Sequence, residues 1–182
     1  MVLVTALKME IHIRNEEPRD IKAVREILRA TFPTDAESRL VDALRANGKA
    51  IISLVAVNED EVLGHILFSE VSITSPGGAP PPNEAKGIGL APVAVRPDMQ
   101  SRRIGSKLIH QGLRLCSQLS YDYCVVLGSP EYYGRFGFEK ASTFGMQNEY
   151  GVDDEFMLID FGYKDVPGGL LKYAPEFALF SV

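Results

Sequence analysis

The stretch "QSRRIGSKLI", residues 100 to 109, combines the features of a helix start with those of an anion site. Two arginines, one glycine and a small hydroxyl residue lead directly into a segment with an apolar helical face. The first N–H groups of a helix have no partners within the helix, and the aligned peptide dipoles make that end partially positive. A loop that exposes such groups binds phosphate through its backbone. The stretch therefore predicts a local anion site.

Within this site we expect the N–H groups of residues 102 to 106 to point at the anion, with Arg103 inside the first helical turn. Gly105 permits close approach of the ligand, and Ser106 adds a hydroxyl donor. The pattern lacks the spacing of a nucleoside-triphosphate loop and of a dinucleotide-binding turn. The predicted anion-binding residues are Gln100, Ser101, Arg102, Arg103, Ile104, Gly105 and Ser106.

The composition places limits on the possible partners. The chain has 182 residues, of which 46% are hydrophobic and 24% charged, and its net charge is −5. A broad nucleic-acid surface needs the opposite sign of charge, so we expect no nucleic-acid partner and only local anion binding. The first residues lack the pattern of a signal peptide, and no apolar run is long enough to span a membrane. We expect one cytoplasmic domain over residues 1–182, without a metal site and with two buried thiols, Cys116 and Cys124.

The order of predicted elements indicates a mixed α/β fold. We expect strands at 9–14, 51–57, 61–73, 88–95, 122–128 and 155–161, with the second and third forming a hairpin. Helices are predicted after Pro18, between Asp35 and Asn47, from the motif to about residue 119, and at 129–136. Residues 75–87 form an exposed proline-rich loop. Antiparallel neighbours must therefore share one mixed sheet with a strand–helix–strand crossover.

Two motifs in this order resemble the signatures of the GNAT superfamily, the Gcn5-related N-acetyltransferases. "LAPVAVRPDMQSRRIGSKLI" (90–109) is similar to the family's cofactor motif, and "VVLGSPEYYGRFGFEKA" (125–141) is similar to its second signature. Gln100, Arg103 and Gly105 stand at the Gln/Arg, first glycine and second glycine/alanine positions, so Arg103 departs from the pattern. The resemblance implies a mostly antiparallel sheet splayed between its fourth and fifth strands, with helices on both faces.

The resemblance also implies an acetyl-CoA-dependent N-acetyltransferase that uses direct attack by a primary amine in a ternary complex. The backbone of Val93, Ala94 and Val95 would receive the pantetheine arm, and an N–H there would polarise the thioester carbonyl. Pro92 by itself indicates either a strand edge or a bulge, and the resemblance favours the bulge. A CoA-binding module without turnover is the alternative, and an interaction domain without any cofactor is a third.

For catalysis, Tyr133 aligns with the family tyrosine that protonates the CoA sulfur, whereas Tyr132 is expected to face packing. His65, in the middle of a strand, has the ordinary pKa of a base near neutral pH, but it equally fits a satisfied polar core residue. Glu70 and Glu37 are the other candidates for binding or deprotonating an amine. The identity of the acceptor is left open, as is whether the protein forms a homodimer. The acceptor pocket is expected to use residues 32–37, the loop 75–87 and the segment after Phe138.

Overall fold

The computed structural model describes residues 9–81 and 83–180, and all elements below belong to these residues. The strands are β1 (His12–Asn15), β2 (Ile52–Asn58), β3 (Glu61–Thr74), β4 (Gly87–Val95), β5 (Tyr123–Leu127), β6 (Glu139–Lys140), β7 (Met146–Asn148), β8 (Phe156–Asp160) and β9 (Gly169–Lys172). The α-helices are α1 (Ile21–Thr31), α2 (Ala36–Ala46), α3 (Ile104–Gln118) and α4 (Pro130–Gly134). The 3₁₀ turns are Pro18–Asp20, Pro97–Met99, Ala141–Phe144 and Pro175–Phe180.

The strands form the predicted mixed sheet in the order β1-β2-β3-β4-β5-β8-β6. Neighbours along this path are antiparallel except β4 and β5, which are parallel and are connected through α3. The end of β3 also pairs with β9, which in turn pairs with β7. The hairpin of β2 and β3 matches its prediction, whereas β1 begins three residues later than expected. The short strands β6, β7 and β9 were not individually predicted.

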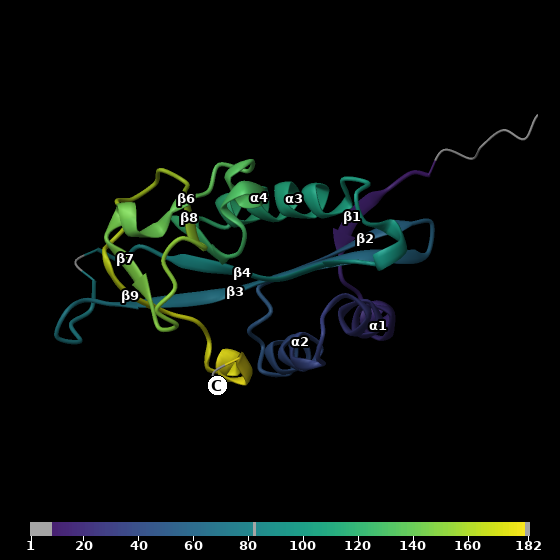
Figure 1. Cartoon of the computed structure of the whole chain (residues 1–182), viewed down its shortest axis with the longest axis horizontal. Helices are drawn as coiled ribbons and strands as arrows, with labels where there is room; N and C mark the ends of the chain where they lie inside the picture. Colours follow the sequence, from purple (N-terminus) through teal and green to yellow (C-terminus); the bar gives the residue numbers. More distant parts are fainter. Residues whose placement is uncertain (1–8, 82, 181–182) are drawn as a thin grey trace, which may run out of the picture.

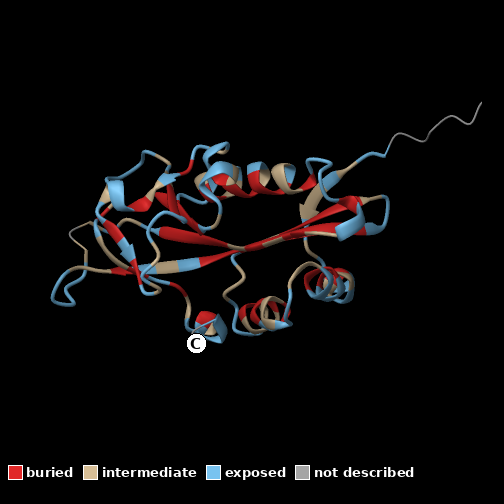
Figure 2. Ribbon diagram, in the orientation of Figure 1, coloured by how far each residue is buried: buried red, intermediate tan, exposed pale blue. Residues whose placement is uncertain are grey.

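Helices cover both faces of the sheet (Figure 1). Helices α3 and α4 lie on one face, while α1, α2 and the C-terminal 3₁₀ turn lie on the other. Figure 2 shows that the buried residues concentrate in the sheet and on the helix surfaces that face it. This arrangement confirms the predicted layers.

The helices bury the apolar positions that the sequence periodicity indicates. In α1, Val24 and Leu28 are fully buried, and in α2, Leu40 and Leu44 are buried in the same way. Each such leucine or valine contributes about 1.5–3 kcal/mol through removal of its side chain from water. On the opposite face, α3 places Leu108 and its apolar neighbours against the sheet. The two free cysteines are buried there as expected.

Strands β4 and β5 separate after a short stretch of pairing. Their register covers only Gly87 to Gly89 of β4 against Tyr123 to Val125 of β5. Beyond that point β5 continues against β8, and β4 continues against β3. The β3–β4 register shifts where Ala91 and Pro92 together face the single residue Leu67. Because Pro92 lacks an N–H, the ladder is interrupted there and β4 carries a bulge. The predicted splay and bulge are both present.

Candidate active site

The predicted anion site lies at the start of α3, with a backbone that differs from the expected one. Arg103 has φ +65° and ψ +14°, the left-handed region, and it is the N-cap residue; the helix begins at Ile104. Ser101 is also left-handed, with φ +61°. The prediction that Arg103 lies inside the first helical turn is therefore wrong. A side chain in this region costs about 1–2 kcal/mol, which gives a physical reason for the glycine in the motif that this chain resembles.

The N-terminus of α3 opens into a cavity of about 550 Å³. No side chain caps the helix, so its first N–H groups stay free for a ligand. Arg103 and Arg135 supply positive charge, and no carboxylate is present among the described lining residues. The lining residues are Thr31, Val93, Ala94, Val95, Met99, Gln100, Ser101, Arg103, Ile104, Gly105, Ser106, Tyr132 and Arg135. Arg102 is exposed and does not line this cavity, unlike the other predicted anion-binding residues.

The backbone of β4 forms one wall of the site. The N–H of Arg96 donates to the carbonyl of Leu63, which fixes the alternation of the β3–β4 ladder. By that alternation Ala94 bonds to β3, whereas the backbone groups of Val93 and Val95 point toward the open side. The Val95 carbonyl accepts hydrogen bonds from Thr31 at 3.3 Å and from the Gln100 side chain at 3.1 Å. Gln100 therefore braces the strand, and the N–H of Val93 remains directed into the opening.

A second cavity, of about 410 Å³, occupies the opening between β4 and β5. It shares Val93 with the first cavity, so the two meet at β4. Its lining residues are Phe32, Glu37, Leu40, Leu90, Ala91, Pro92, Val93, Val126, Leu127, Tyr133, Tyr150, Val152, Tyr173, Phe177 and Phe180. Two of the three expected acceptor segments contribute, whereas no described residue of the loop 75–87 does.

Tyr133 lines the second cavity from α4. Ser129 caps this helix by accepting a hydrogen bond from the N–H of Tyr132, and Pro130 occupies the first turn. The Tyr133 ring is 8% exposed and packs against Gly128, where any Cβ would overlap it. Burial raises the pKa of the Tyr133 phenol well above its usual value, with smaller contributions from Tyr132 and Cys124. The hydroxyl therefore keeps its proton at neutral pH.

The geometry agrees with what comparisons with known proteins show. The family model "Acetyltransferase (GNAT) domain" matches residues 12–141. The chain belongs to the GNAT acetyltransferase family. It is 30% identical over 172 residues to the N-acetyltransferase YhbS of Escherichia coli K12, covering 92% of this chain and 99% of YhbS.

Two solved structures of this family are similar to the chain. A GNAT family acetyltransferase from Brucella melitensis, in complex with acetyl-CoA, is 37% identical, with a TM-score of 0.75 over 93% of this chain and 99% of that one. The YhbS structure from E. coli, in complex with CoA, is 29% identical, with a TM-score of 0.83 over 93% and 92%. This chain is an N-acetyltransferase of the same family.

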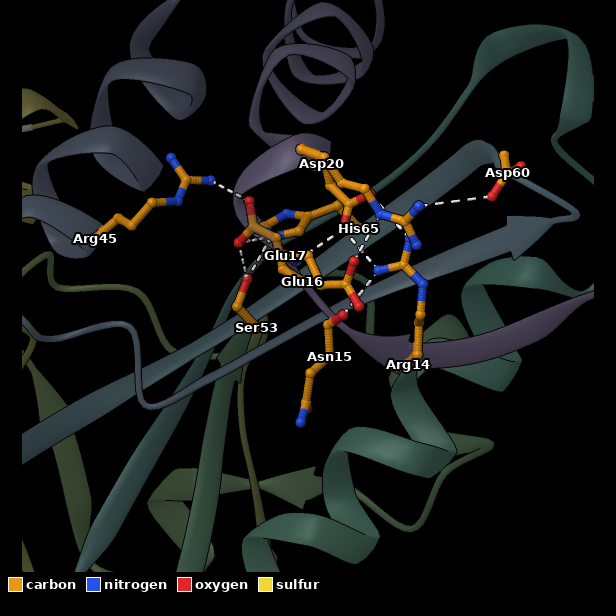
Figure 3. Close-up of polar contacts among 10 residues, drawn as sticks. Arg14, Asn15, Glu16, Glu17, Asp20, Arg45, Ser53, Asp60 and His65 are labelled. Carbon is orange, nitrogen blue, oxygen red and sulfur yellow. Dashed lines mark hydrogen bonds and ion pairs between the residues drawn. The ribbon is translucent and has the colours of Figure 1, made fainter.

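The predicted base His65 lies outside both cavities of this acetyltransferase. Figure 3 shows it in a polar cluster with Ser53, Glu16 and Arg45. The ring is fully buried, its Nε2 lies 2.8 Å from the Ser53 hydroxyl, and that hydroxyl donates to Glu16. Burial lowers the pKa of His65 despite the opposing influence of Glu16. His65 is thus a core residue that lines neither cavity, and its Nδ1 has no hydrogen-bond partner. Its role as a base stays a prediction.

Of the other candidate bases, only Glu37 reaches the site. Glu70 accepts a hydrogen bond from Tyr121 at 2.8 Å and does not line the second cavity. Glu37 lies in the first turn of α2 and does line it. Within residues 9–81 and 83–180 there is no group of side chains that could hold a metal ion. None of the helices in these ranges has the length and apolar character needed to cross a membrane.

Sequence reasoning missed several lining residues of the first cavity. Tyr132 was expected to face packing but lines the cavity, with its hydroxyl over Gly105: a Cβ at Gly105 would be 3.1 Å from that oxygen. The guanidinium of Arg135 lies 4.5 Å from the centre of the Tyr132 ring and lines the same cavity. Tyr132 and Arg135 are three residues apart, a spacing that places two side chains on one face of a helical turn, and this spacing was the signal in the sequence. Thr31 comes from α1 and left no signal in the sequence.

Proposed function

We propose that this protein transfers the acetyl group of acetyl-CoA to a primary amine by direct attack within a ternary complex. The observation that carries the proposal is the uncapped start of α3, which opens into a cavity with two arginines and no carboxylate among the described lining residues. Free N–H groups, the helix dipole and guanidinium groups together favour a diphosphate. The two family structures in complex with acetyl-CoA and CoA support the same ligand.

The pantetheine arm then follows β4 into the opening beside β5. There the N–H of Val93 would donate to the thioester carbonyl oxygen and stabilise the negative charge that develops on it. The amine nitrogen attacks the carbonyl carbon, the carbon–sulfur bond breaks, and the CoA sulfur takes the proton of the Tyr133 hydroxyl. The acceptor attacks as the neutral amine, after its ammonium form has released one proton to solvent. The nitrogen gives up a second proton as the amide forms, and this proton returns through solvent to the Tyr133 oxygen, so the products are an N-acetyl amide and CoA and the enzyme is restored.

Adjacent tyrosines on α4 allow the roles of cofactor binding and proton donation to be separated. Tyr133→Phe is expected to lower kcat more than tenfold with little change in the Kd for CoA, because only the proton donor is lost. Tyr132→Phe is expected to raise the Kd for CoA severalfold with little change in kcat, because its hydroxyl lies over the diphosphate site.

Calorimetry with CoA and thiol release across classes of amine measure these two quantities. Failure of the wild-type protein to bind CoA would refute the proposal. Binding without thiol release from any amine would leave a CoA-binding module instead. Near-wild-type turnover of Tyr133→Phe would remove the assignment of Tyr133.

A further inference from the structure

The second cavity carries one charge in an apolar surrounding. Glu37 is the only ionisable residue other than tyrosine among its described lining residues. One carboxylate oxygen of Glu37, Oε2, is buried and has no hydrogen-bond partner. A desolvated carboxylate oxygen without a partner is unfavourable, so a donor brought by a ligand would be strongly favoured there.

An aromatic wall stands in the same cavity. Tyr150, Tyr173, Phe177 and Phe180 all line it and follow one another with ring centroids 6.0, 4.9 and 6.4 Å apart. The hydroxyl of Tyr173 is likewise buried and without a hydrogen-bond partner. Aromatic faces attract cations as well as apolar groups. The wall therefore suits an apolar body that carries a positive charge.

We propose that Glu37 binds the ammonium group of the acceptor, and that the acceptor is a primary amine on an apolar or aromatic body without a carboxylate. This inference rests on the proposed acetyltransferase function, because it names the acceptor of that reaction. An amino acid would bring its own carboxylate beside Glu37, and like charges repel at short range. A polyamine would place further ammonium groups against apolar side chains with no second carboxylate to pair with.

The test uses 2-phenylethylamine as the probe and the CoA complex as the receptor, so that no acetyl transfer takes place. By calorimetry we expect the wild type to bind the probe at least tenfold more tightly than it binds phenylalanine or spermidine. Glu37→Gln keeps the shape of the side chain but removes its charge, and it is expected to raise the Kd for the probe at least tenfold. Tyr173→Phe is expected to raise the Kd for the probe about threefold.

The matched control is Glu139→Gln, an equal charge change at an exposed residue of β6 that lines neither cavity. It should bind the probe within twofold of the wild type. Equal probe affinity in Glu37→Gln and wild type would overturn the inference, as would an equal affinity for phenylalanine or no binding of the probe. Thermal unfolding of each variant shows that the comparison is between folded proteins.

Thiol release with acetyl-CoA separates this inference from the proposed function. If the probe binds through Glu37 but no thiol is released, the proposed function fails and the assignment of the amine site stands. If Glu37→Gln acetylates spermidine or phenylalanine at the same rate as the wild type does, the function stands and the acceptor inference fails.

Discussion

Gly128 provides a way to move Tyr133 without changing its chemistry. In Gly128→Ala the new Cβ would lie 2.3 Å from Cε2 of Tyr133 and 2.8 Å from Cδ2. Carbon atoms in contact prefer about 3.5–4.0 Å, so the ring must move by roughly 1 Å or more. Phe136 and Phe138 pack against the ring on other sides, so it has little freedom within the core. The phenol is therefore displaced relative to the cavity.

A displacement of about 1 Å can cost on the order of 100-fold in rate when a reacting group is misplaced. We expect kcat of Gly128→Ala to fall by about that factor, with the Kd for CoA within threefold of the wild type. Overpacking should also lower the free energy of unfolding by about 1–3 kcal/mol. The measurements are steady-state thiol release, CoA calorimetry and urea unfolding.

The nearby Gly134 is the matched control, because a Cβ there meets no heavy atom within 4 Å. Gly134→Ala should keep wild-type kcat and unfold with equal or up to about 1 kcal/mol higher stability. In the double variant Gly128→Ala/Tyr133→Phe, turnover should match that of Tyr133→Phe alone, since the group being displaced is already gone. Wild-type turnover in Gly128→Ala, or a further 100-fold loss in the double variant, would refute the reasoning.

Three further predictions concern the first cavity and the core. Arg103→Gly removes the strain of a left-handed side chain from the folded state but raises the conformational entropy of the unfolded chain, so the free energy of unfolding should stay within about 1 kcal/mol of the wild type. The Kd for CoA should rise about fivefold because the guanidinium is lost; unchanged affinity by calorimetry would count against a role for the guanidinium. Burial raises the pKa of Glu16, but this effect is outweighed by hydrogen bonding to His65 and Ser53 and by the charge of Arg45. Together they lower the pKa of Glu16 to about 2. The stability that Glu16 contributes is therefore present above about pH 4.5 and lost as the pH falls toward 2, which amounts to roughly 2 kcal/mol after solvent screening; urea unfolding of Glu16→Gln should show a shallower acid slope than the wild type, and parallel slopes would contradict the assignment. Gly112→Ala places a Cβ 2.3 Å from the Phe68 ring, so its urea midpoint should fall by an amount that corresponds to about 1–3 kcal/mol; a midpoint equal to that of the wild type would show that the ring moves freely.

The fold could be predicted because local sequence patterns determine its elements. The apolar spacing of α1 and α2, the hairpin turn after Asn58 and the proline in β4 each fix a feature that needs only neighbouring residues. The start of α3, where the anion site is predicted, was predictable for the same reason, since a helix start carries its own dipole and free donors.

The features that the sequence did not reveal depend on distant segments or on one backbone angle. The left-handed conformation of Arg103 follows from how the 3₁₀ turn before it meets α3, which residue type alone does not reveal. His65 is a core residue because Glu16, far away in the sequence, forms a polar cluster with it across the sheet. The aromatic wall arises where Tyr150, between β7 and β8, meets Tyr173, Phe177 and Phe180, which follow β8. These segments lie far apart in the sequence, so no local periodicity predicts the wall.

In the proposed reaction, the charges of the two cavities would allow an acidic protein to select an anionic donor and a cationic acceptor. At physiological ionic strength the Debye length is about 8 Å, so the net charge of −5 has less influence at a site than the groups that line it. On one side of β4 the lining carries Arg103 and Arg135, and on the other it carries Glu37. Val93, which is uncharged, belongs to both. Each substrate would therefore be attracted to its own side, and the thioester carbon and the amine nitrogen would meet where the backbone N–H of Val93 faces the opening.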